Sequence, residues 1–151
     1  MDAVIVPGSF VDVLGRLLLA MLFGGLIGLN REAQGKPAGL RTHALVALGA
    51  ATLTIVGLLL QGSDSGAPSR VLQGIVAGVG FIGAGVILHR HDGHGIEGLT
   101  TAAAIWIVAA IGVAAGAGLW RTGASAVAVA LVVLVVGETV DRWVHKDQPR
   151  S

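Results

Sequence analysis

The sequence contains no cysteine, few aromatic residues (4%) and little charge (13%). Without cysteine, neither disulfides nor thiolate metal sites can form. A formal net charge of +1 and the scarcity of aromatic side chains exclude a nucleic-acid partner, which needs dense basic patches and stacking surfaces. A soluble domain has about a quarter of its residues charged. Half that content, with 54% hydrophobic residues, indicates a membrane protein that lies in the lipid bilayer.

Long apolar runs are what the chain has instead. A bilayer core is crossed by about 20 apolar residues in a helix, and lipid leaves no water to satisfy an open strand. We therefore predict an all-α membrane protein, a single transmembrane domain over residues 1–151 with five helices. The predicted spans are 10–29, 44–60, 71–88, 99–120 and 122–140.

The cations are divided unequally between the two ends of these helices. With the N-terminus outside, seven Lys and Arg side chains are cytoplasmic and three are outside, as the positive-inside rule requires. The C-terminus is then cytoplasmic, and we expect a multi-pass membrane protein. Asp12 and Arg16 stand at i and i+4, so we expect them to pair near the membrane surface.

Residues 24–44 align without a gap with residues 83–103, at an offset of 59, and seven of 21 positions are identical. Chance matches are common in a chain rich in Gly and Ala, but here both copies end in Gly-Leu-x-Thr. We expect Thr42 and Thr101 to be the N-caps of the following helices. The predicted architecture is two parallel helical hairpins plus a fifth helix.

Glycines recur at the four-residue spacing that lets membrane helices approach closely. The third run is richest in them, so we expect it to form a central, tightly packed helix. We favour packing inside one protomer over a homodimer, which the same spacing permits. The predicted helix-packing residues are Gly24, Gly28, Gly74, Gly78, Gly83, Gly85, Gly112 and Gly116.

The loops carry the candidate functional residues. Arginines beside two helix N-termini suit a phosphate, a carboxylate or a partner protein. The alternative is a solvated turn with ion pairs worth less than about 1 kcal/mol. The candidates in loops and caps are Asn30, Arg31, Arg41, Thr42, Arg90 and Thr101.

Catalytic and metal sites are not expected. The cluster of His89, His91, Asp92 and His94 has no recognisable ligand spacing, so we predict neither a metal nor a cofactor. No nucleophile–base pair is apparent, and we predict that the protein is not an enzyme. No charged residue lies near the middle of a span, which disfavours an ion-coupled carrier. We expect Trp106 in the core and Trp120 and Trp143 at the membrane interfaces.

Three motifs in order resemble the MgtC/SapB family of bacterial inner-membrane proteins, over about residues 15–135. They are GGLIGLNREAQGKPAGLRTHALVALGA, GIVAGVGFIGAGVILHR and GLTTAAAIWIVAAIGVAAGAG. The resemblance implies five spans with the C-terminus inside. It also implies a role in growth at low magnesium and in survival within macrophages, through binding other membrane proteins such as ATP synthase.

The chain departs from the family pattern at two points. Asn30 stands where the family usually has Glu, and the soluble C-terminal domain of several members is not expected here. The resulting hypothesis is a regulatory or adaptor membrane protein linked to magnesium limitation or virulence-type stress adaptation. The alternative is a small Mg²⁺ transporter or channel that acts as an oligomer.

Overall fold

Five long helices make up most of the computed structural model, which describes residues 7–61, 66–89 and 96–144. All five are long and apolar enough to cross a membrane, which confirms the prediction of an all-α protein with five spans. The helices are α1 (Phe10–Ala33), α2 (Leu40–Leu59), α3 (Ala67–Val86), α4 (Leu99–Gly116) and α5 (Trp120–Val144).

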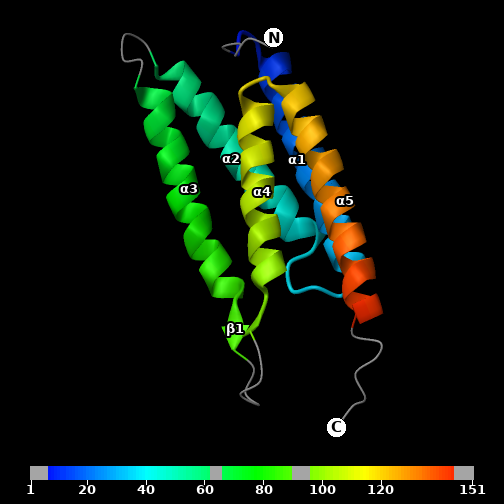
Figure 1. Cartoon of the computed structure of the whole chain (residues 1–151). Coiled ribbons are helices and arrows are strands. Elements are labelled where there is room, and N and C mark those ends of the chain that lie inside the picture. The colour runs from blue at the N-terminus through cyan, green and yellow to red at the C-terminus, as the bar shows by residue number, and fades with distance from the viewer. Residues whose placement is uncertain (1–6, 62–65, 90–95, 145–151) are drawn as a thin grey trace.

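Consecutive helices run in opposite directions (Figure 1). The α1–α2 and α3–α4 connections therefore lie at one end of the molecule, together with the last residues of α5. We call this the loop end, and it includes the connecting residues 34–39, 87–89 and 96–98. The first residues of α1 and the α4–α5 turn lie at the opposite end.

The connection between α3 and α4 contains a short hairpin that the sequence analysis did not predict. Its strands are β1 (Leu88–His89) and β2 (Ile96–Glu97), which pair antiparallel. Gly98 then begins α4 with φ +90°, a left-handed conformation, and a Cβ atom there would collide with the carbonyl oxygen of Val86. Glycine is required at this position for both reasons.

Most helix boundaries differ from the prediction by a few residues, and at the ends of α1 and α4 the cause is a glycine in a left-handed conformation. Gly35 (φ +65°) ends α1, and the next residue, Lys36, donates its amide to the Arg31 carbonyl at 3.1 Å. Gly118 (φ +78°) ends α4 in the same way, so the connection between α4 and α5 lies at residues 117–119 rather than further along the chain. Both ends are hydrogen-bonded reversals of the Schellman type.

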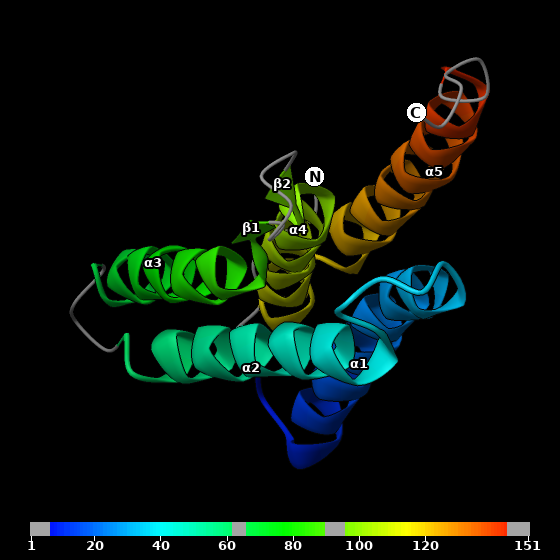
Figure 2. The same cartoon turned by 90° about the horizontal axis from the view of Figure 1, so that it is seen from below.

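The central helix is α4, and the expectation that the third run would be central is wrong. Viewed from below, α4 lies between α2 and α3 on one side and α1 and α5 on the other (Figure 2). Half of the most apolar 18 residues of α4 are buried, against 17% of those of α3. A helix rich in glycine offers little side-chain area to bury, so α3 remains at the edge.

The glycines of α3 mostly face open space within the protomer. A Cβ atom added to Gly74, Gly78 or Gly85 would meet no other atom within 4 Å, whereas one added to Gly83 would lie 3.5 Å from the Cβ of Ala102 on α4. Three of the four α3 positions expected to pack inside the protomer therefore do not.

The glycines of α1 and α4 hold α2 between these two helices. A Cβ atom added to Gly24 on α1 would lie 2.7 Å from the Cβ of Ala47. One added to Gly112 on α4 would lie 2.9 Å from the Cα of the same Ala47. Gly28 and Gly116 make similar contacts one turn further along their helices, so the three backbones are in close contact.

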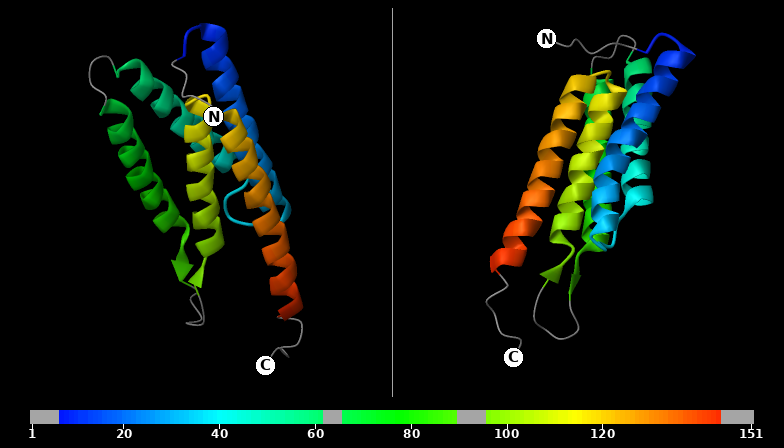
Figure 3. Two further views of the ribbon diagram at one scale, coloured as in Figure 1. Left: turned by 45° about the horizontal axis from the view of Figure 1, so that its top comes forward. Right: turned by 90° about the vertical axis from the view of Figure 1, so that its right-hand side faces the viewer.

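The two aligned segments have corresponding positions in the structure. Gly39 and Gly98 are the N-caps of α2 and α4, and the residue that follows each begins the helix. The preceding helices differ, however, because α1 continues to Ala33 while α3 ends at Val86, before the position that would match. In Figure 3 the strands β1 and β2 follow α3 and precede α4, whereas no strand lies between α1 and α2.

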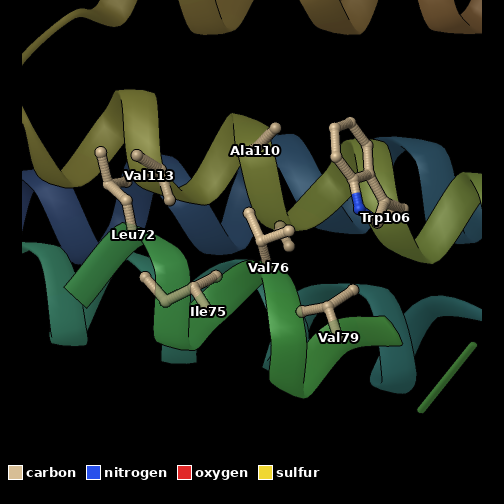
Figure 4. Close-up of a pocket in the computed structure, with 8 residues that line it drawn as sticks. Leu72, Ile75, Val76, Val79, Trp106, Ala110 and Val113 are labelled. Atoms are coloured by element: carbon tan, nitrogen blue, oxygen red, sulfur yellow. The ribbon is translucent and has the colours of Figure 1, made fainter. Parts of the chain in front are cut away.

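Trp106 is not a core residue, contrary to expectation. It is 49% exposed and lies on α4 at the edge of a small apolar pocket of about 130 Å³ beside α3. Figure 4 shows its ring near Val76 and Val79 of α3. The adjacent Ile105 is fully buried, because it lies on the side of α4 that faces the other helices.

Candidate functional site

A buried arginine at the loop end connects α1 to α4. Arg31 lies in the last turn of α1 and is only 3% exposed. Its Nη1 donates to the Oε1 of Gln34 at 2.9 Å, and its Nη2 donates to the Oγ1 of Thr101 at 3.3 Å. Its Nε has no hydrogen-bond partner among the described residues. The guanidinium group is therefore incompletely satisfied, although it is buried.

Charge compensation for Arg31 comes from α5. The carboxylate of Glu138 attracts the Arg31 guanidinium electrostatically. A buried cation is tolerated only when opposite charge and hydrogen bonds offset its loss of hydration. Through Thr101 on α4, which is 2% exposed, Arg31 thus links α1 to α4, and Glu138 adds an attraction from α5.

A fully buried histidine on α2 lies near Arg31. His43 on α2 is 0% exposed, and its Nδ1 lies 3.0 Å from the carbonyl oxygen of Gly39. Its Nε2 has no partner among the described residues. The side chain fits because Gly28 of α1 has none, and a Cβ atom added there would lie 3.0 Å from the Cβ of His43.

We call Arg31, Gln34, His43, Thr101 and Glu138 the Arg31 cluster. The charge of Arg31 also acts on His43, so the five side chains form one electrostatic neighbourhood. Two nitrogens of this cluster, Arg31 Nε and His43 Nε2, are buried without partners among the described residues. Such groups are costly to bury in a structural core and are often found at functional sites.

The other predicted residues are only partly brought together. Arg41 is exposed and Thr42 is half-buried, both in the first turn of α2. Asn30 is half-buried on α1, and its Oδ1 has no partner among the described residues. Arg90 lies outside the described residues, as do His91, Asp92 and His94.

The threonines do not cap their helices, and that expectation is corrected. The N-caps are Gly39 and Gly98, so Thr42 and Thr101 lie inside the first turns. At α2 a carboxylate replaces the expected hydroxyl, because the Oε2 of Glu32 accepts the amide of Leu40 at 2.8 Å. At α4, Thr101 does not cap the helix, and its hydroxyl accepts the hydrogen bond from Arg31.

Three members of the cluster were not identified from the sequence. His43 directly precedes the predicted span 44–60, whereas in the structure it lies one helical turn into α2, four residues after the N-cap Gly39. Gln34 has no distinguishing motif. Glu138 is an ionisable residue within an apolar helix, a pattern that usually marks function, but it is not among the residues predicted from the sequence.

At the opposite end, the predicted pair of Asp12 and Arg16 is present. The Nε of Arg16 donates to the Oδ1 of Asp12 at 3.0 Å, and its Nη1 donates to the Gly116 carbonyl oxygen at 2.9 Å. Arg16 of α1 is 7% exposed. Its guanidinium lies beside the C-terminal end of α4, where a cation is favourable. This contact fastens α1 to α4 and is structural.

A metal-binding group is absent from residues 7–61, 66–89 and 96–144: no three His, Asp or Glu side chains there lie close enough to share an ion.

Five apolar helices, four of them arranged around α4, with an arginine buried at the loop end, define a multi-pass α-helical membrane protein. The chain belongs to the MgtC family, because the sequence model of that family matches residues 17–143.

Three bacterial relatives illustrate the similarity. The chain is 48% identical to protein SrpB of Synechococcus elongatus over 82% of its own length and 74% of the relative's. It is 50% identical to protein MgtC of Brucella abortus over 66% of its own length and 40% of the relative's. A third relative from Escherichia coli strain K12, named "Putative magnesium transporter YhiD", is 46% identical over 80% of this chain and 58% of the relative. No solved structure matches the chain.

Proposed function

We propose that this MgtC family protein is a regulatory or adaptor protein that binds other membrane proteins at its loop end. The observation that carries the proposal is the distribution of polarity. In the described residues, ionisable side chains lie towards the helix ends, and the middles of the five helices have none. A protein that moves ions usually has a charged or ionisable group at that depth.

The loop end combines features suited to recognition of a partner. The Arg31 cluster has side chains from four helices and a hydrogen bond between α1 and α4, and Lys36 and Arg41 are exposed at the same end. An exposed cation attracts acidic segments of a partner, and a rigid support reduces the entropy lost on binding. We assign this end to the cytoplasm and the chain to the bacterial inner membrane, on the positive-inside rule.

The relatives supply the physiological context of the proposal. One is named MgtC and another carries magnesium transport in its name. We assign this chain to adaptation to magnesium limitation or virulence-type stress, with no enzymatic activity. The family resemblance makes ATP synthase a partner to test first.

A pull-down with matched charge variants tests the proposal. Lys36→Glu and Arg41→Ala alter the exposed cations of the loop end, and Arg70→Gln removes one exposed cation from the opposite end. We expect the loop-end variants to recover at least about fivefold less partner, as the loss of one interfacial charge contact predicts, and Arg70→Gln to match the wild type. Equal recovery with all three variants would remove the loop end from the mechanism.

Magnesium transport is the second candidate function, and the name of the YhiD relative favours it. A pathway lined by α3 would have to form between copies of the chain, because α3 lies at the edge of the protomer. Purified protein in vesicles would then carry Mg²⁺ faster than empty vesicles do. No flux above the empty vesicles would dispose of this candidate.

A further inference from the structure

An apolar groove runs between the outward sides of α1 and α2, near the loop end. Its volume is about 500 Å³. These two helices lie side by side in the right-hand view of Figure 3. The groove is lined by Met21, Leu22, Gly25, Leu26, Leu29, Leu40, Arg41, Ala44, Leu45 and Leu48.

The groove is deep because small residues lie at the contact of the two helices and large ones flank it. Gly25 is buried and Ala44 is half-buried, whereas Leu22, Leu26 and Leu45 are 55%, 41% and 66% exposed. On α2 the lining extends from Leu40 to Leu48. At 1.5 Å per residue this is about 12 Å, most of the depth of one hydrocarbon leaflet.

Arg41 is the one charged residue of the lining, and it lies at the loop end of the groove. It is exposed, and its side chain makes no hydrogen bond or ion pair with any described residue. It also lies in the first turn of α2, where the helix dipole is positive. An anion at this position gains from both, and it would lie at the height of the membrane surface, where phospholipid headgroups are found.

We propose that the groove binds one phospholipid with an anionic headgroup. Its phosphate contacts the Arg41 guanidinium, and one acyl chain lies against Gly25 and Ala44 between the leucines. The apolar lining matches an acyl chain, and the lone cation at one end matches an anionic headgroup, in the order in which a lipid presents them.

A transmembrane helix of a partner fits the same groove less well. Close packing of helices needs small residues along the contact. Here the rims carry protruding leucines, Leu22, Leu26 and Leu45, which keep a rod about 10 Å wide away from Gly25 and Ala44. A flexible acyl chain has no such restriction.

Native mass spectrometry of the purified full chain tests the proposal, with phosphatidylglycerol and phosphatidylcholine that carry the same acyl chains. The wild type should retain one phosphatidylglycerol in preference to phosphatidylcholine. Arg41→Gln should lower this retention about fivefold, as expected for one cation near a lipid headgroup. Lys36→Gln is the matched control, because it removes the same charge from the same end outside the groove, and should retain phosphatidylglycerol like the wild type.

A second variant blocks the apolar part of the groove. Ala44→Trp should abolish retention of phosphatidylglycerol, and its melting temperature should show that it still folds. If Ala44→Trp does not fold, Arg41→Gln decides alone, because an exposed residue without partners is replaceable. Equal retention of the two lipids by the wild type, or equal loss in the Arg41 and Lys36 variants, would overturn the proposal. The partner pull-down is independent, because no partner protein is present in this experiment.

Discussion

Arg31 is the residue on which the loop end depends. Its guanidinium is buried at the point where α1, α4 and α5 meet, and it has one neutral acceptor on another helix, Thr101. Hydrogen bonds to buried charged groups are worth about twice those between neutral groups. The stability of this end should therefore respond to the loss of a single hydroxyl.

Thr101→Val tests that dependence with almost no change of shape. We expect the free energy of unfolding to fall by about 1–3 kcal/mol, because Nη2 of Arg31 loses its partner while remaining buried. Thr52→Val is the control. Thr52 is exposed and bonds only within its own helix, to the Leu48 carbonyl at 2.8 Å, so a change within about 0.5 kcal/mol is expected. Reversible unfolding in mixed micelles measures both, and equal effects would contradict the role of Thr101.

For His43 we make a different prediction, because its buried side chain makes few hydrogen bonds. Its Nε2 has no partner in the part of the chain that the structure describes, and the Gly39 carbonyl that faces Nδ1 also accepts the His43 amide at 3.2 Å. His43→Leu should therefore change the free energy of unfolding by less than about 1 kcal/mol. If the histidine is kept for function, this variant will fold and yet fail to restore growth of a deletion strain at low magnesium. A stable variant that restores growth fully would remove His43 from the functional site.

At the scale of the helices, the same Gly-x-x-x-Gly spacing has different consequences on α3 and α4. Gly112 and Gly116 lie against the backbone of α2, whereas a Cβ atom added to Gly74 or Gly78 would meet no described atom of another helix within 4 Å. The spacing of glycines along a sequence does not show which helix, if any, packs against them. For this reason the sequence predicted glycine contacts but could not rank the helices by burial.

Alanine substitutions distinguish the two cases. Gly112→Ala should lower the free energy of unfolding by about 1–3 kcal/mol, because the new methyl group meets the backbone of Ala47, which has little freedom to move. Gly78→Ala should be neutral or stabilising by up to about 1 kcal/mol, since alanine favours a helix over glycine. Both are measured by the same unfolding assay. Destabilisation by Gly78→Ala would indicate that α3 is covered by another chain in the membrane.

Helix number was predictable from the sequence, and helix ends were less so. Hydropathy located five runs because lipid demands about 20 apolar residues for each span. It missed the turn at Gly118, because that turn is formed by apolar residues and depends on a positive φ. It also assigned Arg31 and His43 to a loop, since polar residues at a helix end resemble a loop in hydropathy alone.

At the scale of the whole molecule, the Arg31 cluster is assembled from segments distant in the sequence. Arg31, His43, Thr101 and Glu138 lie on four helices, and only the crossing of these helices brings them together. The alignment of the two copies predicted arginines beside the N-termini of both following helices. It could not show that Arg31 contacts the threonine of the other copy, Thr101, rather than Thr42.

The orientation of the whole molecule in the membrane is the remaining prediction, and the absence of cysteine makes it directly measurable. Any cysteine introduced is the only thiol in the chain. Lys36→Cys places it at the exposed loop end, and Ser69→Cys at the exposed opposite end. With the loop end cytoplasmic, a maleimide that does not cross membranes should label Ser69→Cys in intact spheroplasts, and Lys36→Cys only after lysis. The positive-inside rule predicts this result because cations resist translocation. Labelling of Lys36→Cys in intact spheroplasts would place the Arg31 cluster outside the cell, away from any cytoplasmic segment of a partner.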